Sequence, residues 1–399
     1  MKNIFVINAH WNNHGDEAAI RAMIDELKEN SEVRVAIQIL SGTCYQYEYN
    51  TDEVELVPLY PRRRNFLEAI LGIITKGKIV WSKNGKLFFE KMKNSDLVIH
   101  APGGPSIGDL YKGEEILYWL RLLAAYRFKV RYFFYAPSAG PFKIHWRNFI
   151  RKILYKNASG ITFREDLSKK YFEEILPNIN ATVTLDAAFQ HDIDVDENER
   201  ILKQDKELSD FLNENKKIVG LTITDLQWHP KYSSNEELSN HINEEISKLV
   251  EYLVKMGYKV IFIPQLFGEQ NDYDYMKKFE QKNCYTMSEK YNCYFQQYII
   301  SKIYAVIGMR YHSNIFAAKM GTPFISISYE QKMKGFINKI DYNDYCLDIH
   351  EFNAEKIIKK FVMLIEKYED IQKKLKEIKL ELKAEAYKTT LMVFSLLKK

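Results

Sequence analysis

Cysteine is scarce in this chain, and long hydrophobic runs are missing from it. Four cysteines occur in 399 residues, and they form neither a CxxC pair nor a dense framework. The small number and the spacing of these cysteines exclude a scaffold held together by disulfides, and they predict no zinc site. No segment approaches the roughly 20 apolar residues of a transmembrane helix, and the apolar run near the N-terminus is too short and wrongly flanked for a signal peptide. We therefore expect a soluble, cytoplasmic protein with reduced thiols.

The chain also lacks a strong excess of one charge. Lys and Arg number 57 against 53 Asp and Glu, and the net charge of +4 is too small to indicate a nucleic-acid partner. Hydrophobic residues make up 46% and charged residues 28%, which is typical of globular proteins, and the length favours two domains. One basic run at residues 61–66, PRRRNF, would suit peripheral contact with the inner face of the plasma membrane, although a solvated loop explains it more simply.

Apolar, strand-like runs alternate with helix-like segments through most of the sequence. In the first half, strands are expected at 3–9, 33–40, 96–104 and 130–140, with helices at 16–30 and 114–128. In the second half, strands are expected at 217–224, 258–265, 304–309 and 323–329, with a helix near 235–256. This alternation predicts an α/β fold with parallel sheets covered on both faces.

A polar, strongly charged segment separates the two series of strands. It predicts a linker at residues 196–215, between an N-terminal Rossmann-like domain at 1–195 and a C-terminal Rossmann-like domain at 216–399. Over about the last fifty residues, apolar positions recur at three- and four-residue spacing, which predicts a long C-terminal helical segment. The expected architecture is two Rossmann-like open-sheet domains facing a cleft.

Candidate ligand-binding residues follow the ends of several predicted strands, where open α/β sheets bind their ligands. After the first strand, Gly15 permits a tight turn and Asp16 can cap the next helix. With Asn13 beside them, this helix start could also receive an acceptor hydroxyl or an anion. Capping alone would explain Asp16 equally well.

Two further loops carry weaker signals. In APGGPSIGD, Gly103 and Gly104 would let a ligand approach the backbone closely, and Asp109 ends the loop; a plain turn is the alternative interpretation. Arg164 lies at the junction of another strand and helix, where its guanidinium would point into a cleft. A surface salt bridge would explain an arginine there as well.

The most informative stretch is IGMRYHSN, at the end of a predicted strand. Arg310 can hold a carboxylate or phosphate through two hydrogen bonds, and His312 can exchange a proton near neutral pH. Lys332, after the next strand, adds a cation. This combination suits an anionic substrate that must be protonated, although a structural ion pair or a satisfied histidine remains the alternative for each residue alone.

Four blocks of the sequence together resemble the polysaccharide pyruvyl transferase family. They are GDEAAI, APGGPSIGD, FREDLS and GMRYHSNIFAAKMGTPFISISYEQKMKGF, and they occur in the expected order. The resemblance implies a fold like that of the GT-B glycosyltransferases and transfer of pyruvate from phosphoenolpyruvate onto two sugar hydroxyls as a ketal, in cell-surface polysaccharide biosynthesis. The first loop departs from the commoner N-x-G-D form because His14 stands beside the glycine.

The resemblance also implies roles for particular residues. Arg310, His312 and, by a weaker match, Arg164 correspond to the family's donor site. We expect His312 to act as general acid, while the arginines and Lys332 stabilise phosphate and carboxylate charge. Either Asp16 or Asp109 would orient or deprotonate the acceptor. The remaining residues expected to bind substrate are Asn13, Gly15, Gly103, Gly104 and Tyr311.

No cofactor and no tightly held metal are expected. The partners are phosphoenolpyruvate and a sugar acceptor, whose lipid or nucleotide carrier stays open. A nucleotide-sugar glycosyltransferase on the same fold is the nearest alternative, and it would release a nucleoside diphosphate. An inactive sugar-binding homologue is a further alternative. A dinucleotide-dependent enzyme is disfavoured because neither strand-to-helix turn carries the glycine fingerprint.

Overall fold

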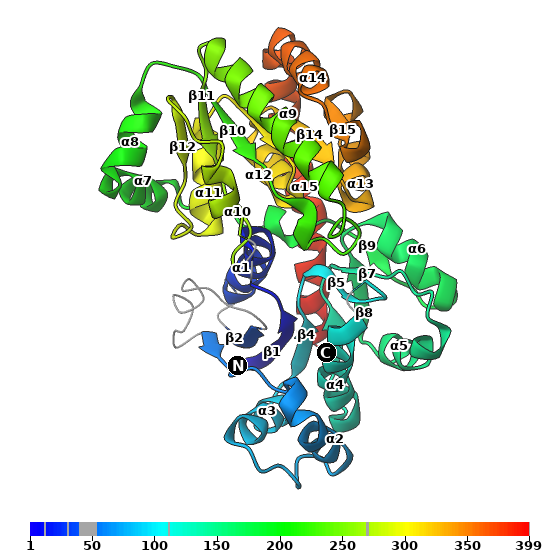
Figure 1. Cartoon of the computed structure of the whole chain (residues 1–399). Helices are drawn as coiled ribbons and strands as arrows, with labels where there is room; N and C mark the ends of the chain where they lie inside the picture. Colours follow the sequence, from blue (N-terminus) through cyan, green and yellow to red (C-terminus); the bar gives the residue numbers. More distant parts are fainter. Residues whose placement is uncertain (12, 30–31, 40–53, 111, 269–270, 399) are drawn as a thin grey trace. The chain divides into compact units, whose positions relative to one another are not determined.

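The computed structural model describes residues 1–11, 13–29, 32–39, 54–110, 112–268 and 271–398. The chain forms two compact units, each with its own sheet (Figure 1). The N-terminal unit comprises residues 1–12, 16–191 and 383–399, and the C-terminal unit comprises residues 13–15 and 192–382. Cys44 lies outside the described residues, while Cys284, Cys293 and Cys346 form no disulfide with any residue that is described.

The N-terminal unit is built on a seven-stranded parallel sheet with the strand order β3-β2-β1-β4-β6-β8-β9. Its strands are β1 (Lys2–Ala9), β2 (Val33–Ile39), β3 (Val54–Leu56), β4 (Leu97–His100), β6 (Tyr132–Phe134), β8 (Gly160–Phe163) and β9 (Thr182–Val183). A separate parallel pair is formed by β5 (Gly103–Ile107) and β7 (Pro137–Ala139). The order in which the chain adds strands reverses between β1 and β4, which makes the ends of these two strands the usual ligand position.

Helices cover both faces of this sheet, as the apolar strands require. Ile4 and Val6 of β1 belong to one core cluster, whereas Phe5 and Ile7 belong to the other, because successive side chains of a strand point to opposite faces. The helices are α1 (His14–Lys28), α2 (Phe66–Ile74), α3 (Lys83–Lys93), α4 (Lys112–Phe128), α5 (Asn148–Lys156) and α6 (Asp166–Ile175). Short 3-10 turns lie at Arg63–Asn65, His145–Arg147 and Ala187–Phe189.

The C-terminal unit repeats this architecture with six parallel strands in the order β12-β11-β10-β13-β14-β15. They are β10 (Ile218–Thr222), β11 (Lys259–Phe262), β12 (Cys284–Thr286), β13 (Ala305–Gly308), β14 (Phe324–Ser328) and β15 (Cys346–Asp348). The helices are α7 (Val195–Gln204), α8 (Lys206–Asn213), α9 (Glu236–Lys255), α10 (Asp272–Lys277), α11 (Cys293–Lys302), α12 (Tyr311–Met320), α13 (Gln331–Lys339), α14 (Ala354–Glu366) and α15 (Tyr368–Leu397), with 3-10 turns at Leu226–Trp228, Asn343–Tyr345 and Ile349–Glu351. Here the order of strands reverses between β10 and β13.

The units differ from the expected domain ranges at three places, the first of which is the grouping of residues 13–15 with the C-terminal unit. The segment expected as a charged linker is mostly helical and groups with the C-terminal unit. Its helices are capped by their own aspartates: Asp194 accepts from the backbone N–H of Glu197, and Asp205 accepts from that of Leu208. At the other end, α15 begins in the C-terminal unit, but from residue 383 onward it groups with the N-terminal unit. No described helix is both long and apolar enough to span a bilayer.

Candidate active site

Arg310 lies at the carboxyl end of β13 and directly precedes α12. Its Nε donates to Asp272 Oδ2 at 3.0 Å, and its Nη2 donates to Asp272 Oδ1 at 2.5 Å and to Thr224 Oγ1 at 2.6 Å. The guanidinium carbon lies 4.7 Å from the ring centroid of Trp228. Burial by itself lowers the pKa of Arg310, but Asp272 and Tyr329 outweigh it and raise the pKa. The arginine is therefore a fixed cation that is only 7% exposed.

Asp272 also fixes the loop that follows β11. Its Oδ2 accepts hydrogen bonds from the backbone N–H groups of Gln265 and Leu266, at 3.0 and 2.9 Å. Gln265 is buried, and its side-chain Nε2 has no hydrogen-bond partner within the described part of the chain. A buried amide donor of this kind is available to a ligand. Neither residue was among the candidates expected from the sequence, although Gln265 ends the expected strand 258–265 and Asp272 follows that strand.

The loop of residues 13–15, which groups with the C-terminal unit, packs against this segment. Asn13 forms an antiparallel bridge with Leu266, and the backbone N–H of His14 donates to the carbonyl of Gln265 at 2.9 Å. A Cβ atom built on Gly15 would lie 1.9 Å from Nδ1 of His312. Only glycine fits at this position without displacing the imidazole, so the first loop and the Arg-Tyr-His triplet meet.

His312 and Tyr311 occupy the first turn of α12. His312 is 8% exposed, and its ring meets that of Tyr311 in a T-shaped contact with centroids 5.0 Å apart. Lys332 lies close by, with its Nζ 5.6 Å from the Tyr311 ring centroid. A cation and an imidazole thus both lie near the same tyrosine ring, at the ends of adjacent strands β13 and β14.

Glu330 links Lys332 to a second histidine. Its Oε2 lies 2.5 Å from Lys332 Nζ, and its Oε1 lies 2.8 Å from Nε2 of His229. Burial alone would raise the pKa of Glu330, but Lys332 and His229 outweigh it and hold the pKa far below the usual range. Glu330 therefore stays ionised and holds Lys332 in place.

Asp16 and Gly103 meet in the N-terminal unit. Asp16 lies in the first turn of α1, and a Cβ atom on Gly103, whose φ is +133°, would lie 3.0 Å from Asp16 Oδ1. The positive φ and this close approach both favour glycine. A Cβ atom on Gly104 would meet no described atom within 4 Å. The structure thus places Asp16 beside the glycine loop.

Asp109 lies in a buried ion pair. Its Oδ1 accepts from Arg151 Nη2 at 2.7 Å and its Oδ2 accepts from the backbone N–H of Ile144 at 3.0 Å. Burial raises the pKa of Asp109, yet these hydrogen bonds outweigh it and the pKa is lowered. The same arginine also binds Glu115 through Nε and Nη2. This network accounts for Asp109 as a residue that anchors α5.

Arg164 is also held within the N-terminal unit. At the end of β8 its Nη1 donates to Asp186 Oδ2 at 2.7 Å, and its Nε donates to Ser138 Oγ at 2.8 Å and lies 3.2 Å from Glu165 Oε2. Its side chain is buried. These partners explain why the junction tolerates a buried arginine.

Two histidines that sequence analysis did not single out lie at the strand reversal of the N-terminal sheet. His10 follows β1, and its Nε2 lies 3.1 Å from the hydroxyl of Tyr118. Burial lowers the pKa of His10, and nearby Asp16 opposes this shift. His100 ends β4, where its two ring nitrogens bond Asn8 and Ser106 at 3.0 and 2.8 Å. Their place directly after apolar strands was the available signal.

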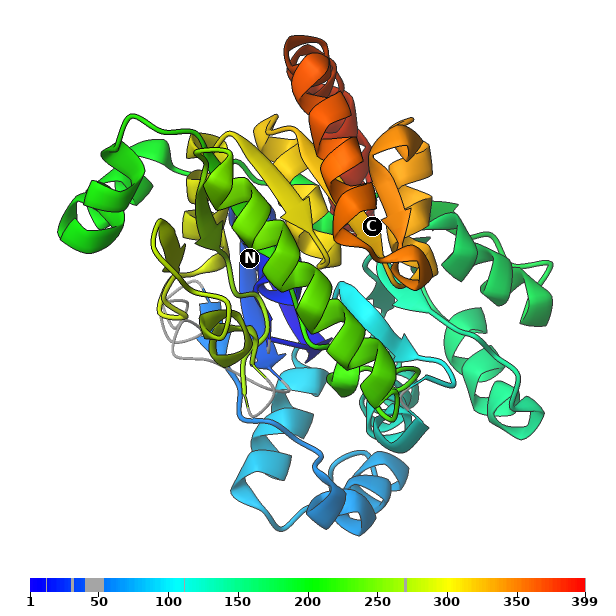
Figure 2. The same ribbon diagram turned by 45° about the horizontal axis from the view of Figure 1, so that its top comes forward.

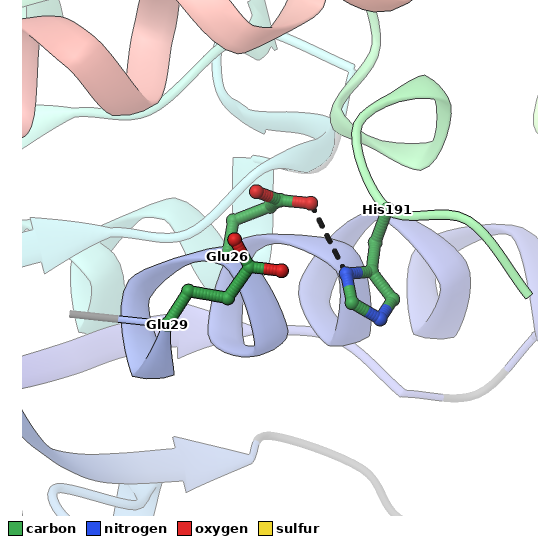
Figure 3. A group of neighbouring side chains, drawn as sticks. All are labelled: Glu26, Glu29 and His191. Carbon is green, nitrogen blue, oxygen red and sulfur yellow. Dashed lines mark hydrogen bonds and ion pairs between the residues drawn. The ribbon is translucent and has the colours of Figure 1, made fainter. Parts of the chain in front are cut away.

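One group of side chains has the spacing of metal ligands within the described residues. Glu26 of α1, Glu29 directly after this helix, and His191 bring their ligand atoms within 4.8 Å of one another (Figure 3). His191 Nδ1 lies 3.1 Å from Glu26 Oε1, so a hydrogen bond already joins two of the three. Glu26 stands ten residues after Asp16 on α1, about 15 Å along the helix axis. The group is therefore separate from the residues considered above.

Comparison with known proteins finds a matching family and a distant relative. A family described as Polysaccharide pyruvyl transferase matches residues 13–331. The amylovoran biosynthesis protein AmsJ of Erwinia amylovora is 22% identical over 413 residues, which cover 94% of this chain and 94% of AmsJ.

Solved structures with the same fold include nucleotide-sugar enzymes. The UDP-GlcNAc 2-epimerase of Neisseria meningitidis has a TM-score of 0.63 at 14% identity, with both chains fully covered. A glycosyltransferase of Rickettsia africae has a TM-score of 0.61 at 13% identity, covering 100% of this chain and 97% of that one. The ADP-heptose heptosyltransferase II of E. coli has a TM-score of 0.50 at 11% identity, covering 92% of this chain and all of the other.

At such identities these structures show the fold alone, which is α/β with two Rossmann-like parallel sheets and GT-B-like neighbours. The family match is more specific, because it extends over most of the chain and includes the first loop, the glycine loop and the Arg-Tyr-His triplet. The chain belongs to the polysaccharide pyruvyl transferase family.

Proposed function

We propose that this protein transfers the pyruvyl group of phosphoenolpyruvate onto two hydroxyls of a saccharide, forming a ketal during the synthesis of a cell-surface polysaccharide. The observation that carries the proposal is the meeting of the first loop with His312, beside the fixed cation Arg310, at the strand reversal of the C-terminal sheet. The family match and the name of the relative AmsJ support the same conclusion.

The donor would bind through its two anionic groups. Arg310 is oriented by Asp272, and Lys332 is oriented by Glu330, so both cations are in place before the donor arrives. The buried amide of Gln265 adds a neutral hydrogen-bond donor. Arg164 is likewise held by an acidic partner, Asp186, and it enters this proposal through the resemblance.

His312 would act as the general acid. It gives a proton to the methylene carbon of phosphoenolpyruvate, which becomes the methyl group, and one saccharide hydroxyl adds to the neighbouring carbon. A second hydroxyl then attacks the same carbon, the bond to the phosphate oxygen breaks, and phosphate leaves. One hydroxyl proton replaces the proton that His312 gave, and the other leaves with phosphate. The balance is one donor and two hydroxyls consumed for one ketal and one phosphate.

We assign Asp16 as the base that takes a proton from the attacking saccharide hydroxyl. Asp109 is already bound to Arg151 and to a backbone N–H, which leaves it poorly suited to the task. Asp16 follows Gly15 directly in the chain and lies close enough to His10 to influence the pKa of that imidazole. We assign His10 to the acceptor as well, where its neutral imidazole can take part with Asp16 in removing the hydroxyl proton.

A phosphate-release assay with phosphoenolpyruvate and a saccharide acceptor tests the proposal directly. We expect phosphate release that depends on the acceptor, together with a saccharide whose mass has increased by one pyruvyl ketal. Release of a nucleoside diphosphate from a sugar nucleotide, with no phosphate from phosphoenolpyruvate, would instead identify a glycosyltransferase.

A further inference from the structure

Large apolar side chains are exposed over α2 and the segment that follows it. Phe66, Leu67, Ile74, Ile79 and Trp81 are between 40% and 65% exposed. They lie within sixteen consecutive residues, whereas the other exposed large hydrophobic side chains occur singly or in pairs, such as Trp146 with Phe149. In both ribbon views, α2 and α3 extend from one end of the N-terminal unit (Figures 1 and 2). Such a concentration usually marks a binding surface.

One face of α2 packs on the core of the N-terminal unit, and the rest of the helix carries large apolar side chains that are exposed. Glu68, Ala69 and Gly72 are buried, and a Cβ atom on Gly72 would lie 2.3 Å from the ring of Phe89. Leu67 and Ile74 are seven residues apart, so they share the outward stripe. Ile70 and Ile73 are partly buried and pack against the core, whereas Phe66, Leu67 and Ile74 of the same helix stay exposed and contribute little to that core.

Exposed basic residues precede and follow this apolar stripe in the sequence. Seven basic residues lie between residues 62 and 86, and all are exposed: Arg62, Arg63, Arg64, Lys76, Lys78, Lys83 and Lys86. Arg63 pairs with Glu114, and no ion pair joins the other six to any residue that the structure describes. The single acidic residue of this range, Glu68, is buried. The surface is thus strongly cationic.

Glu68 holds the two parts of the surface together. Its Oε1 accepts hydrogen bonds from the backbone N–H groups of Trp81 and Ser82, at 2.9 and 2.6 Å. This carboxylate is turned inward, where it cannot repel an anionic partner. It also fixes Trp81 beside the first turn of α2, where the indole stands 59% exposed. The tryptophan and the aliphatic stripe consequently belong to one rigid surface.

We propose that residues 62–86, here called the α2 surface, dock the protein onto the surface of an anionic lipid bilayer. An outward aliphatic stripe and a tryptophan suit the boundary between headgroups and acyl chains. The exposed lysines and arginines suit anionic headgroups. The attachment is peripheral, with the apolar stripe entering only the outermost part of the bilayer. This inference does not depend on the proposed reaction.

Flotation of the full-length protein with lipid vesicles tests the proposal. We expect binding to vesicles of phosphatidylcholine mixed with phosphatidylglycerol, little binding to phosphatidylcholine alone, and weaker binding in high salt. Brominated phosphatidylcholine in the mixed vesicles should quench tryptophan fluorescence, and Trp81→Phe should remove most of that quenching. Equal binding to both vesicle types, or none to either, would overturn the proposal.

Two surface variants and two matched controls separate lipid binding from misfolding. Leu67→Ser with Ile74→Ser, and Lys76→Gln with Lys78→Gln and Lys83→Gln, should each weaken vesicle binding by about tenfold or more. The controls change exposed residues elsewhere: Val362→Ser with Met363→Ser, and Lys356→Gln with Lys359→Gln and Lys373→Gln. We expect these controls to bind like the unchanged protein. Binding by the surface variants equal to that of the controls, or self-association abolished by the apolar variant without any vesicle binding, would refute the lipid assignment.

Discussion

A Cβ atom on Gly15 would lie 1.9 Å from Nδ1 of His312, which leaves no room for any side chain between the first loop and the start of α12. The loop is held there by its own backbone, because His14 donates to the carbonyl of Gln265 and Asn13 bridges to Leu266. The position of the histidine ring therefore depends on a residue almost three hundred positions earlier in the sequence.

Gly15→Ala should reduce turnover because the new methyl group must push the His312 ring away. If His312 delivers the proton, a shift of about 1 Å is enough to lower kcat by about two orders of magnitude. Gly335→Ala is the matched control, since a Cβ atom there meets nothing within 4 Å. Rates from acceptor-dependent phosphate release would measure both. Full activity of Gly15→Ala would contradict the assigned position of the general acid.

His312→Ala should lower kcat by about two to four orders of magnitude, as the loss of a general acid does. Binding of phosphoenolpyruvate, measured by calorimetry, should change much less, because Arg310 and Lys332 remain. His350→Ala, which removes an exposed histidine of the same unit, is the control. If the protein were instead an inactive sugar-binding homologue, both variants should behave like the unchanged chain.

Sequence patterns predicted the elements well because strands and helices have local signatures. The apolar run 304–309 became β13, and the alternation of strands and helices correctly gave two parallel sheets. The linker at 196–215 was predicted from its polar and charged composition, but this segment is mostly helical. Asp194 and Asp205, which cap its helices, were signals in the sequence that helices start there.

Partners of the charged side chains could not be predicted in this way. Arg310 meets Asp272 from 38 residues away, and Arg151 meets Asp109 from 42 residues away. Such pairs depend on which strand ends become neighbours in the folded sheet. The local spacing of apolar residues in the sequence does not contain this information. The exposure of Phe66, Leu67 and Ile74 on α2 was also not predictable, since the sequence of an apolar helix does not show which of its large side chains stay outside the core.

Asp16→Asn and Asp109→Asn should separate a catalytic carboxylate from a structural one. Asp16→Asn should lower turnover by about two orders of magnitude with little change in stability. Asp109→Asn leaves Arg151 buried with fewer anionic partners, which should cost about 3 kcal/mol of unfolding free energy. Urea unfolding and phosphate release would be measured on both proteins. The reverse pattern, with stability lost in the first variant and turnover lost in the second, would exchange the two roles.

His100 should make the protein less stable as the pH falls below neutral. Burial, together with His10 and Arg121, lowers the pKa of His100 to about 3. An unfolded histidine has a pKa of about 6.5, so between these values the unfolded state binds more protons and stability decreases with decreasing pH. Between pH 7 and pH 5 this histidine alone should cost about 2 kcal/mol. His100→Gln should flatten the pH dependence of urea unfolding, whereas His145→Gln, at an exposed position, should leave it unchanged. Equal slopes for all three proteins would mean that His100 does not titrate in this way.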